Sequence, residues 1–178
     1  MRFLPAAGRV VTSWRNGAGA TREIVAAGGA EFDWRLSIAV VAGEVEFSRF
    51  PLVDRMLVPL SPEGLQLRVD GIRVELAQWQ VLGFAGEVPV TSLSAGGVTE
   101  DLNLMVRRGV AHGQLVVHAI AGTFELEAAP GESVVVVVLE GSLGYDACVL
   151  GRHDAILLDA TETVALNGTG EVAVARIG

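Results

Sequence analysis

Short apolar runs separated by glycines dominate the pattern of hydrophobic and polar positions in this chain. The apolar runs are rich in valine, and 22 glycines are spread among them. This is the pattern of many short strands joined by tight turns, whereas helical periodicity is weak throughout. The sequence therefore predicts an all-β fold.

The clearest predicted element is a β-hairpin that turns at Asp70-Gly71. Apolar and polar residues alternate in Leu65–Val69 and again in Ile72–Leu76. The Asp-Gly pair between the two runs supplies the positive φ angles that a type I′ turn needs. We expect one face of the hairpin to be buried, formed by Leu65, Leu67, Val69, Ile72, Val74 and Leu76.

The second half of the chain predicts a strand that is covered on both faces. Ser133–Leu139 is apolar without alternation, as in strands inside a sandwich or barrel. A faint internal repeat relates Met56–Leu60, with the following Glu63-Gly64, to Val135–Leu139, with the following Glu140-Gly141, at an offset of roughly 80 residues. The repeat favours two barrel-like halves in one chain.

Composition and charge exclude several classes of partner. The chain has 13 basic and 21 acidic residues and a net charge of −8, which disfavours binding to nucleic acid or to anionic membranes. Cys148 is the only cysteine, so no intrachain disulfide is possible. We expect no signal peptide, and the single thiol fits a reducing, cytoplasmic environment.

Two glycines and several polar side chains gather in the segment from Trp14 to Ile24. Glycines let the backbone approach a ligand closely, and Asn16, Thr21 and Glu23 would supply polar groups. A β-turn with solvated Thr21 and Glu23 explains the same residues equally well.

Two further segments alternate so that polar side chains share one face. In Asp33–Ala39 these are Arg35 and Ser37, which would present donors to a carboxylate if the strand lined a barrel mouth. The alternative is an exposed Arg35 that pairs with Asp33. In Glu100–Arg108 they are Asp101, Asn103 and Met105.

The inward or outward direction of Asp101 and Asn103 decides their role. If they face inward they need a hydrogen-bond network, with Arg55 or Arg35 as its cation. Otherwise Asp101 caps a turn and Asn103 meets solvent. Nearby, Asp54 and Arg55 can simply pair with each other, and Arg107-Arg108 fits a solvated pair better than an anion clamp.

Aromatic residues and histidines give weaker signals. Trp14, Phe47 and Phe50 fit core positions better than ligand-stacking ones. The three histidines lack the spacing of a local metal site, so no metal and no cofactor are expected. His118 fits the wall of a core or barrel, and His153 fits a turn.

Four blocks of residues together resemble the HutD/Ves family. They cover about the first 110 residues. The blocks are Trp14-x-Asn16-Gly17-x-Gly19-x-Thr21-x-Glu23-Ile24, Trp34-Arg35-x-Ser37-x-Ala39, Phe47-Ser48-x-Phe50-Pro51-x-x-Asp54-Arg55 and Asp101-x-Asn103-x-Met105-x-Arg107.

The resemblance implies a bicupin-like fold made of two small β-barrels of the jelly-roll type. The halves would be approximately residues 1–110, with the pocket, and residues 111–178, with exchange of strands between them possible. It also implies a cytoplasmic bacterial protein linked to histidine utilisation. Such a protein would bind a small carboxylate such as formylglutamate without catalysis, in a regulatory or buffering role. The histidine signature of metal-binding cupins is missing here.

The resemblance also implies a set of ligand-binding residues. Arg35 would hold the carboxylate, with Asp101 and Asn103 orienting Arg35 from behind. The full set is Asn16, Thr21, Glu23, Arg35, Ser37, Arg55, Asp101, Asn103 and Met105. Two departures from the family pattern are Ala18, where a glycine is usual, and Leu52, which we expect not to adopt the backbone angles of the glycine it replaces.

Two other functions remain open at this point. One is a metal-independent enzyme that acts on a small acid, with Glu23 or Asp101 as general base. The other is an interaction module that forms a homodimer through an exposed sheet edge, with the polar blocks serving only as turns.

Overall fold

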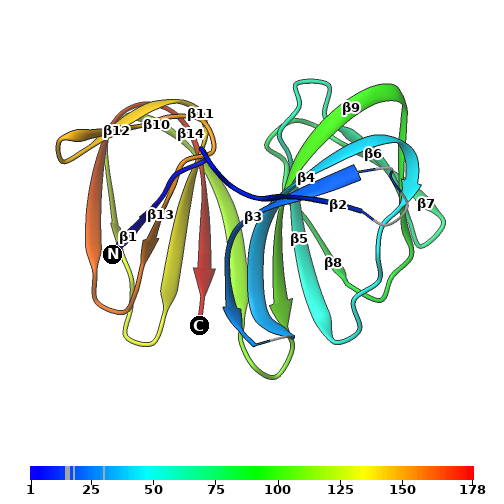
Figure 1. Cartoon of the computed structure of the whole chain (residues 1–178), viewed down its shortest axis with the longest axis horizontal. Coiled ribbons are helices and arrows are strands. Elements are labelled where there is room, and N and C mark those ends of the chain that lie inside the picture. Colours follow the sequence, from blue (N-terminus) through cyan, green and yellow to red (C-terminus); the bar gives the residue numbers. More distant parts are fainter. Residues whose placement is uncertain (15–16, 18, 30) are drawn as a thin grey trace. The chain divides into compact units, whose positions relative to one another are not determined.

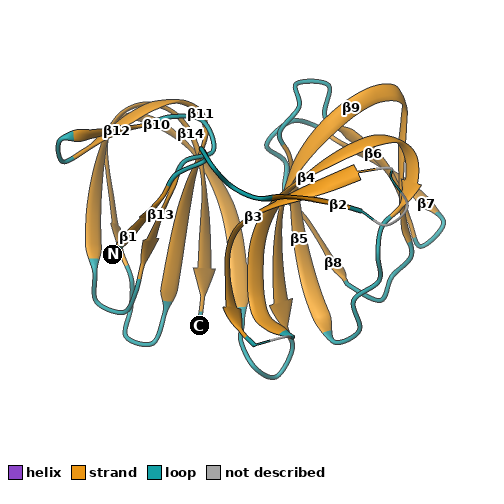
Figure 2. Ribbon diagram, in the orientation of Figure 1, coloured by secondary structure: helices purple, strands orange, loops and turns teal. Residues whose placement is uncertain are grey.

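Strands and connecting turns make up the whole of the described chain. The computed structural model describes residues 1–14, 17, 19–29 and 31–178, with nothing described for the side chains of residues 94–96. Over these residues the chain forms fourteen β-strands and no helix (Figure 2). The predicted all-β class is confirmed. Since the described part contains no helix, it also contains none that could cross a membrane.

The chain divides into two compact units, each with its own sheet. Unit 1 comprises Met1–Arg9 and His112–Gly178, and unit 2 comprises Val10–Ala111. The strands of unit 1 are β1 (Arg2–Leu4), β10 (Gly113–Glu127), β11 (Ser133–Tyr145), β12 (Cys148–Leu150), β13 (Ala155–Leu158) and β14 (Thr163–Ile177) (Figure 1). Those of unit 2 are β2 (Val11–Ser13), β3 (Gly19–Gly28), β4 (Phe32–Glu46), β5 (Val53–Pro59), β6 (Leu65–Val69), β7 (Ile72–Leu76), β8 (Leu82–Ala85) and β9 (Val90–Arg107) (Figure 1).

The sheet of unit 1 is centred on two long strands. Its order is β1-β13-β11-β14-β10, with β12 paired to β11. The apolar run of β11 is buried from Val134 to Leu139 without interruption, so the predicted strand covered on both faces is confirmed. His153 lies in a turn with a φ of 69°, also as predicted, while His118 is half-buried and its ring lies 5.3 Å from that of Phe124, tilted by 44°.

The sheet of unit 2 has the order β2-β3-β4-β9-β5-β8, and β6 pairs with both β7 and β9. Asp70 and Gly71 have φ angles of 49° and 79° between β6 and β7, so the predicted type I′ turn is confirmed. The predicted buried face of this hairpin is wrong at Ile72, which is 68% exposed. Among the described strands β7 pairs only with β6, so no strand flanks Ile72 on its other side.

Candidate functional site

The register of β3, β4, β9 and β5 brings the polar positions of these strands together. All four strands are antiparallel to their neighbours, and residues two apart on a strand face the same side of the sheet. The cross-strand rows on this face are Thr21–Ala39–Asp101, Glu23–Ser37–Asn103 and Arg35–Met105–Arg55. Residues that lie far apart in the sequence therefore form one polar patch inside unit 2.

The patch is the floor of a cavity of about 760 Å³. Eight of the nine residues predicted for the site line it, namely Thr21, Glu23, Arg35, Ser37, Arg55, Asp101, Asn103 and Met105. The ninth, Asn16, lies outside the described residues. The remaining lining residues, which were not predicted for the site, are Thr12, Ser13, Trp14, Ala39, Phe47, Ser48 and Phe50.

Arg55 is a buried cation at the base of the cavity, with 5% of its surface exposed. Its Nη2 donates to Asn103 Oδ1 at 3.0 Å, and its Nη1 donates to the Ser48 carbonyl at 3.4 Å. Its Cζ lies 4.9 Å from the Phe84 ring centroid. Burial lowers the pKa of Arg55 to about 10, and the charge of Asp101 opposes that change. Arg55 is therefore still a cation at neutral pH.

Asp101 is fully buried beside this cation but does not touch it. Asn103 Nδ2 donates to Asp101 Oδ1, and Asp101 Oδ2 has no hydrogen-bond partner. Burial raises the pKa of Asp101 to about 7, while the hydrogen bond from Asn103 and the charge of Arg55 act in the opposite direction. This carboxyl group therefore changes its charge near neutral pH.

The inward network expected for Asp101 and Asn103 is present, and of the two cations considered for it, Arg55 is the one that Asn103 contacts. The orientation of Arg35 by this pair, which the resemblance implied, is not observed among the described contacts. The alternative of a turn-capping Asp101 and a solvated Asn103 is wrong, since both side chains are buried. Asp54 does not pair with its neighbour Arg55, because successive residues of β5 face opposite sides. Asp54 pairs instead with Arg108, at 2.9 Å.

Arg35 is the half-buried cation of the cavity. Its Nη2 contacts Met105 Sδ at 3.1 Å, and its Cζ lies 4.8 Å from the Phe32 ring centroid and 5.6 Å from that of Phe50. Its buried Nε has no hydrogen-bond partner. Burial lowers the pKa of Arg35, and the charge of Glu23 opposes this change. None of the described contacts of Arg35 is with Asp33, so the alternative ion pair is not observed.

Aromatic side chains form another part of the cavity wall. Trp14 Nε1 donates to Thr21 Oγ1 at 2.8 Å, and the Trp14 ring meets the Phe47 ring edge-on at a centroid distance of 6.2 Å. Phe47 belongs to the core of unit 2 and Trp14 packs against that core, as expected, but both residues and Phe50 also line the cavity. For Phe47 and Phe50, the sequence feature that could have indicated a place in the cavity wall was the block Phe47-Ser48-x-Phe50 shortly before Arg55.

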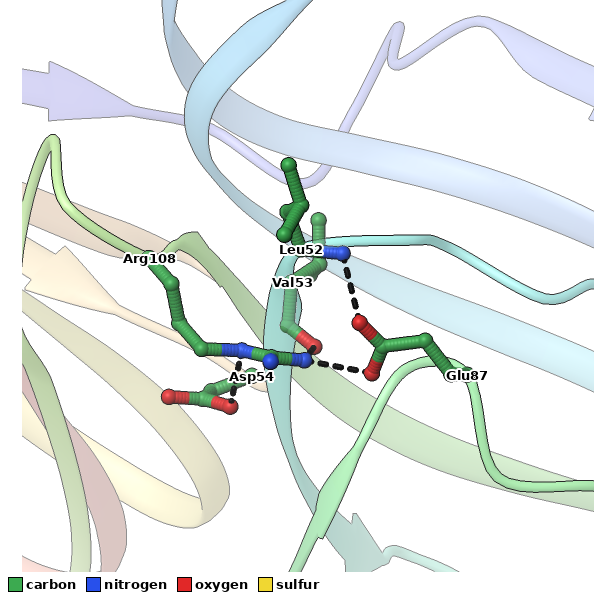
Figure 3. Close-up of polar contacts among 5 residues, drawn as sticks. All are labelled: Leu52, Val53, Asp54, Glu87 and Arg108. Atoms are coloured by element: carbon green, nitrogen blue, oxygen red, sulfur yellow. Dashed lines mark hydrogen bonds and ion pairs between the residues drawn. The ribbon is translucent and has the colours of Figure 1, made fainter.

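A turn with an unusual backbone leads into β5 and thus into Arg55. Leu52 has a φ of 61°, so the expectation that it cannot adopt glycine-like angles is wrong. Figure 3 shows why the conformation persists: the Leu52 amide donates to Glu87 Oε1 at 2.7 Å, and Arg108 contacts Glu87, Asp54 and the Val53 carbonyl. The side chain of Arg108 therefore holds this turn in place. The side chain of Arg107 forms an ion pair with Glu31 at 3.3 Å.

The donor set of the cavity fits an anion better than a metal ion. Among the described residues, its lining contains two guanidinium groups, several hydroxyl groups and no imidazole, and the acids are Glu23 and Asp101. No three His, Cys, Asp or Glu side chains of the described residues are grouped as metal ligands. Guanidinium and hydroxyl groups are hydrogen-bond donors of the kind that can bind an anion.

Solved structures share this fold. HutD from Pseudomonas fluorescens SBW25 superimposes with a TM-score of 0.86 at 26% identity, over 99% of this chain and 97% of that one. A cupin 2 conserved barrel domain protein from Leptotrichia buccalis superimposes with a TM-score of 0.58 at 12% identity, over 89% of this chain and 88% of that one. The second likeness shows that the fold is cupin-like.

Sequence comparisons point to the same group of proteins. Protein Ves from Cronobacter sakazakii is 39% identical over 145 residues, which cover 80% of this chain and 78% of that protein. Protein Ves from Citrobacter koseri is 44% identical over 104 residues, so that 55% of this chain spans about half, 53%, of that relative. The HutD family model matches residues 7–175. The chain therefore belongs to the HutD family, as the four polar blocks of its sequence suggested.

Proposed function

We propose that this protein binds a small carboxylate metabolite in the cavity of unit 2 without transforming it. The ligand class is an intermediate of histidine degradation such as formylglutamate, and the role is regulatory or buffering, in the cytoplasm. Membership of the HutD family supports this proposal. The structure of the P. fluorescens HutD represents a formate condition, and formate is the simplest carboxylate. The two-barrel organisation implied by the resemblance remains a prediction.

Arg35 is the observation that carries the proposal. Its Nε is buried without a partner, and its Nη2 meets only the thioether sulfur of Met105, which is a weak acceptor. A carboxylate accepts two parallel hydrogen bonds from the edge of a guanidinium, and such bonds are shorter and stronger than neutral ones. A carboxylate ligand would thus accept hydrogen bonds from the Arg35 donors that lack a strong acceptor within the protein.

Thermal unfolding with candidate ligands tests the proposal. We expect one of formylglutamate, urocanate, histidine and glutamate to raise the melting temperature. At about 100 times its Kd, a ligand adds about 2.7 kcal/mol, or roughly 5 to 10 °C for a chain of this size. Arg35→Ala should abolish the shift and leave the unliganded melting temperature nearly unchanged. Arg68→Ala is the matched control, because Arg68 is exposed on β6 and does not line the cavity.

Three outcomes would overturn the proposal. The absence of a shift with every compound would remove the link to histidine degradation. A shift that survives Arg35→Ala would place the ligand elsewhere, and unfolding of Arg35→Ala would make Arg35 a structural residue.

One observation favours the enzyme alternative, namely that Asp101 has the near-neutral pKa of a general base. The same mixtures, followed by proton NMR, distinguish the two functions. We expect every compound to remain unchanged over hours. Turnover that is lost in Asp101→Asn would replace binding by catalysis. The predicted homodimer stays a prediction, which sedimentation at micromolar concentration tests.

A further inference from the structure

Asp101 is a buried residue of the cavity lining, and one of its two carboxyl oxygens has no hydrogen-bond partner. The side chain lines the cavity and is fully buried. Oδ1 accepts the hydrogen bond from Asn103 Nδ2, whereas Oδ2 has no partner. A buried polar atom without a partner is costly and calls for an explanation, of which an absent ligand is one.

Asn103 links Asp101 to the buried cation Arg55. Its own Oδ1 accepts from Arg55 Nη2, which fixes the amide so that Nδ2 points to Asp101. Arg55 therefore reaches Asp101 only through the amide, and the carboxylate does not form the direct ion pair that would hold it ionised.

The charged groups around Asp101 come from four strands. Arg55 lies on β5, Arg35 on β4 and Glu23 on β3, and all three line the cavity. On β9 itself the adjacent Glu100 pairs with Arg22 at 3.1 Å. Burial is the largest influence on Asp101 and favours its neutral form. A bound anion would add a negative charge to the cavity and favour the neutral form further.

We propose that the carboxylate ligand enters the cavity together with one proton, which Asp101 Oδ2 holds. The proton comes from the solvent, and the neutral carboxyl group donates it in a hydrogen bond to an oxygen of the ligand. No covalent bond of the ligand is made or broken. This inference rests on the proposed function and adds that binding is coupled to pH.

Binding of formylglutamate measured at pH 6 and pH 8.5 tests the coupling. Ordinary carboxyl groups have pKa values of about 4, so the ligand keeps its charge over this range. If only the protonated form of Asp101 binds, the wild-type Kd rises about tenfold per pH unit above the pKa, which amounts to roughly thirtyfold at pH 8.5. Calorimetry in two buffers of different ionisation heat should show about one proton taken up per ligand at pH 8.

Asp101→Asn is the matched variant for this test. An asparagine at this position can still accept from Asn103, and its NH₂ group takes the place of the protonated oxygen. We expect it to bind formylglutamate at pH 8.5 about as tightly as the wild-type protein does at pH 6, with no dependence on pH. Glu23→Gln controls for the other acid of the cavity and should keep the wild-type slope with pH, whatever its affinity.

The outcomes separate this inference from the function on which it rests. A wild-type Kd that is the same at both pH values overturns the coupling and leaves the binding function intact. A pH dependence that persists in Asp101→Asn also overturns it, because another group then carries the proton. If formylglutamate binds neither at pH 6 nor at pH 8.5, the proposed ligand and this inference are both overturned.

Discussion

Leu52 and Glu87 are joined across the turn that precedes β5. The Leu52 amide donates to Glu87 Oε1 at 2.7 Å, and Glu87 is held in turn by Arg108 (Figure 3). The Arg108 amide also donates to the Leu52 carbonyl, at 2.8 Å. Both backbone groups of Leu52 are thus occupied by distant residues, and these contacts offset the cost of its left-handed conformation.

Replacing Leu52 should reveal that cost. Leu52 is 60% exposed, so shortening its side chain removes little packing. We expect Leu52→Gly to be more stable than Leu52→Ala by about 1 kcal/mol, since alanine shares the left-handed penalty and glycine does not. Urea unfolding of the two variants measures the difference. Equal stability would mean that the turn carries no strain.

Asn103→Ala should be strongly destabilising, because it leaves Arg55 Nη2 without its acceptor and both oxygens of Asp101 without a donor. We expect a loss of about 2 to 4 kcal/mol in urea unfolding. Gln66→Ala is the matched control: Gln66 Oε1 accepts from Arg73 Nη2 at 2.8 Å, but the pair is exposed. That control should cost about 0.5 kcal/mol or less. Similar losses in both variants would contradict the buried network.

Stability should depend on pH through Asp101. Its pKa of about 7 in the folded protein exceeds the value of about 3.9 for an unfolded aspartate. Between these values the folded state binds more protons, so the stability that Asp101 contributes falls as the pH rises, at up to about 1.4 kcal/mol per pH unit.

Asp101→Asn should therefore gain stability relative to wild type from pH 5 to pH 7, and the difference should level off above the folded pKa. Urea unfolding of both proteins at pH 5, 6, 7 and 8 measures it, and other titrating groups cancel in the comparison. A constant difference across this range would show that Asp101 has an ordinary pKa.

Gly86→Ala should displace the segment that carries Phe50. A Cβ atom at Gly86 would lie 2.4 Å from the Phe50 carbonyl oxygen and 2.8 Å from that of Val53. Because both are backbone atoms, we expect a cost of about 1 to 3 kcal/mol and weaker ligand binding. Gly83→Ala on β8 is the control, since its Cβ would meet nothing nearer than 4.0 Å. A harmless Gly86→Ala would show that the segment can move freely.

The sequence was informative about which residues share one face of a strand, because side chains alternate between the two faces. Alternation placed Arg35 with Ser37, and Asp101 with Asn103 and Met105, on shared faces, and the cavity contains all five. The sequence offered Arg55 and Arg35 as partners of Asn103 but could not choose between them, because the choice depends on the register between β5 and β9, whose contacting residues are 48 positions apart.

The backbone conformation of Leu52 and the aromatic residues of the cavity wall could not be predicted from the sequence, for different reasons. Leu52 is held by Glu87, which lies 35 positions away, so no local pattern signals its conformation. Apolar periodicity shows which side of a strand is buried but does not distinguish packed core from the wall of a cavity. Phe47 was therefore correctly placed in the core, but the position of Phe47 and Phe50 in the cavity wall was not predicted.

The division of the chain into two units sets an order for folding during synthesis. Unit 2 is one continuous stretch, Val10–Ala111, so all its strands are available once that stretch has left the ribosome. Unit 1 needs β1, which pairs with β13, and β14, which pairs with both β10 and β11. Residues 2–4 can therefore pair only after β13, more than 100 residues later in the chain, has been synthesised. The cavity can form first, and the other sheet closes after it.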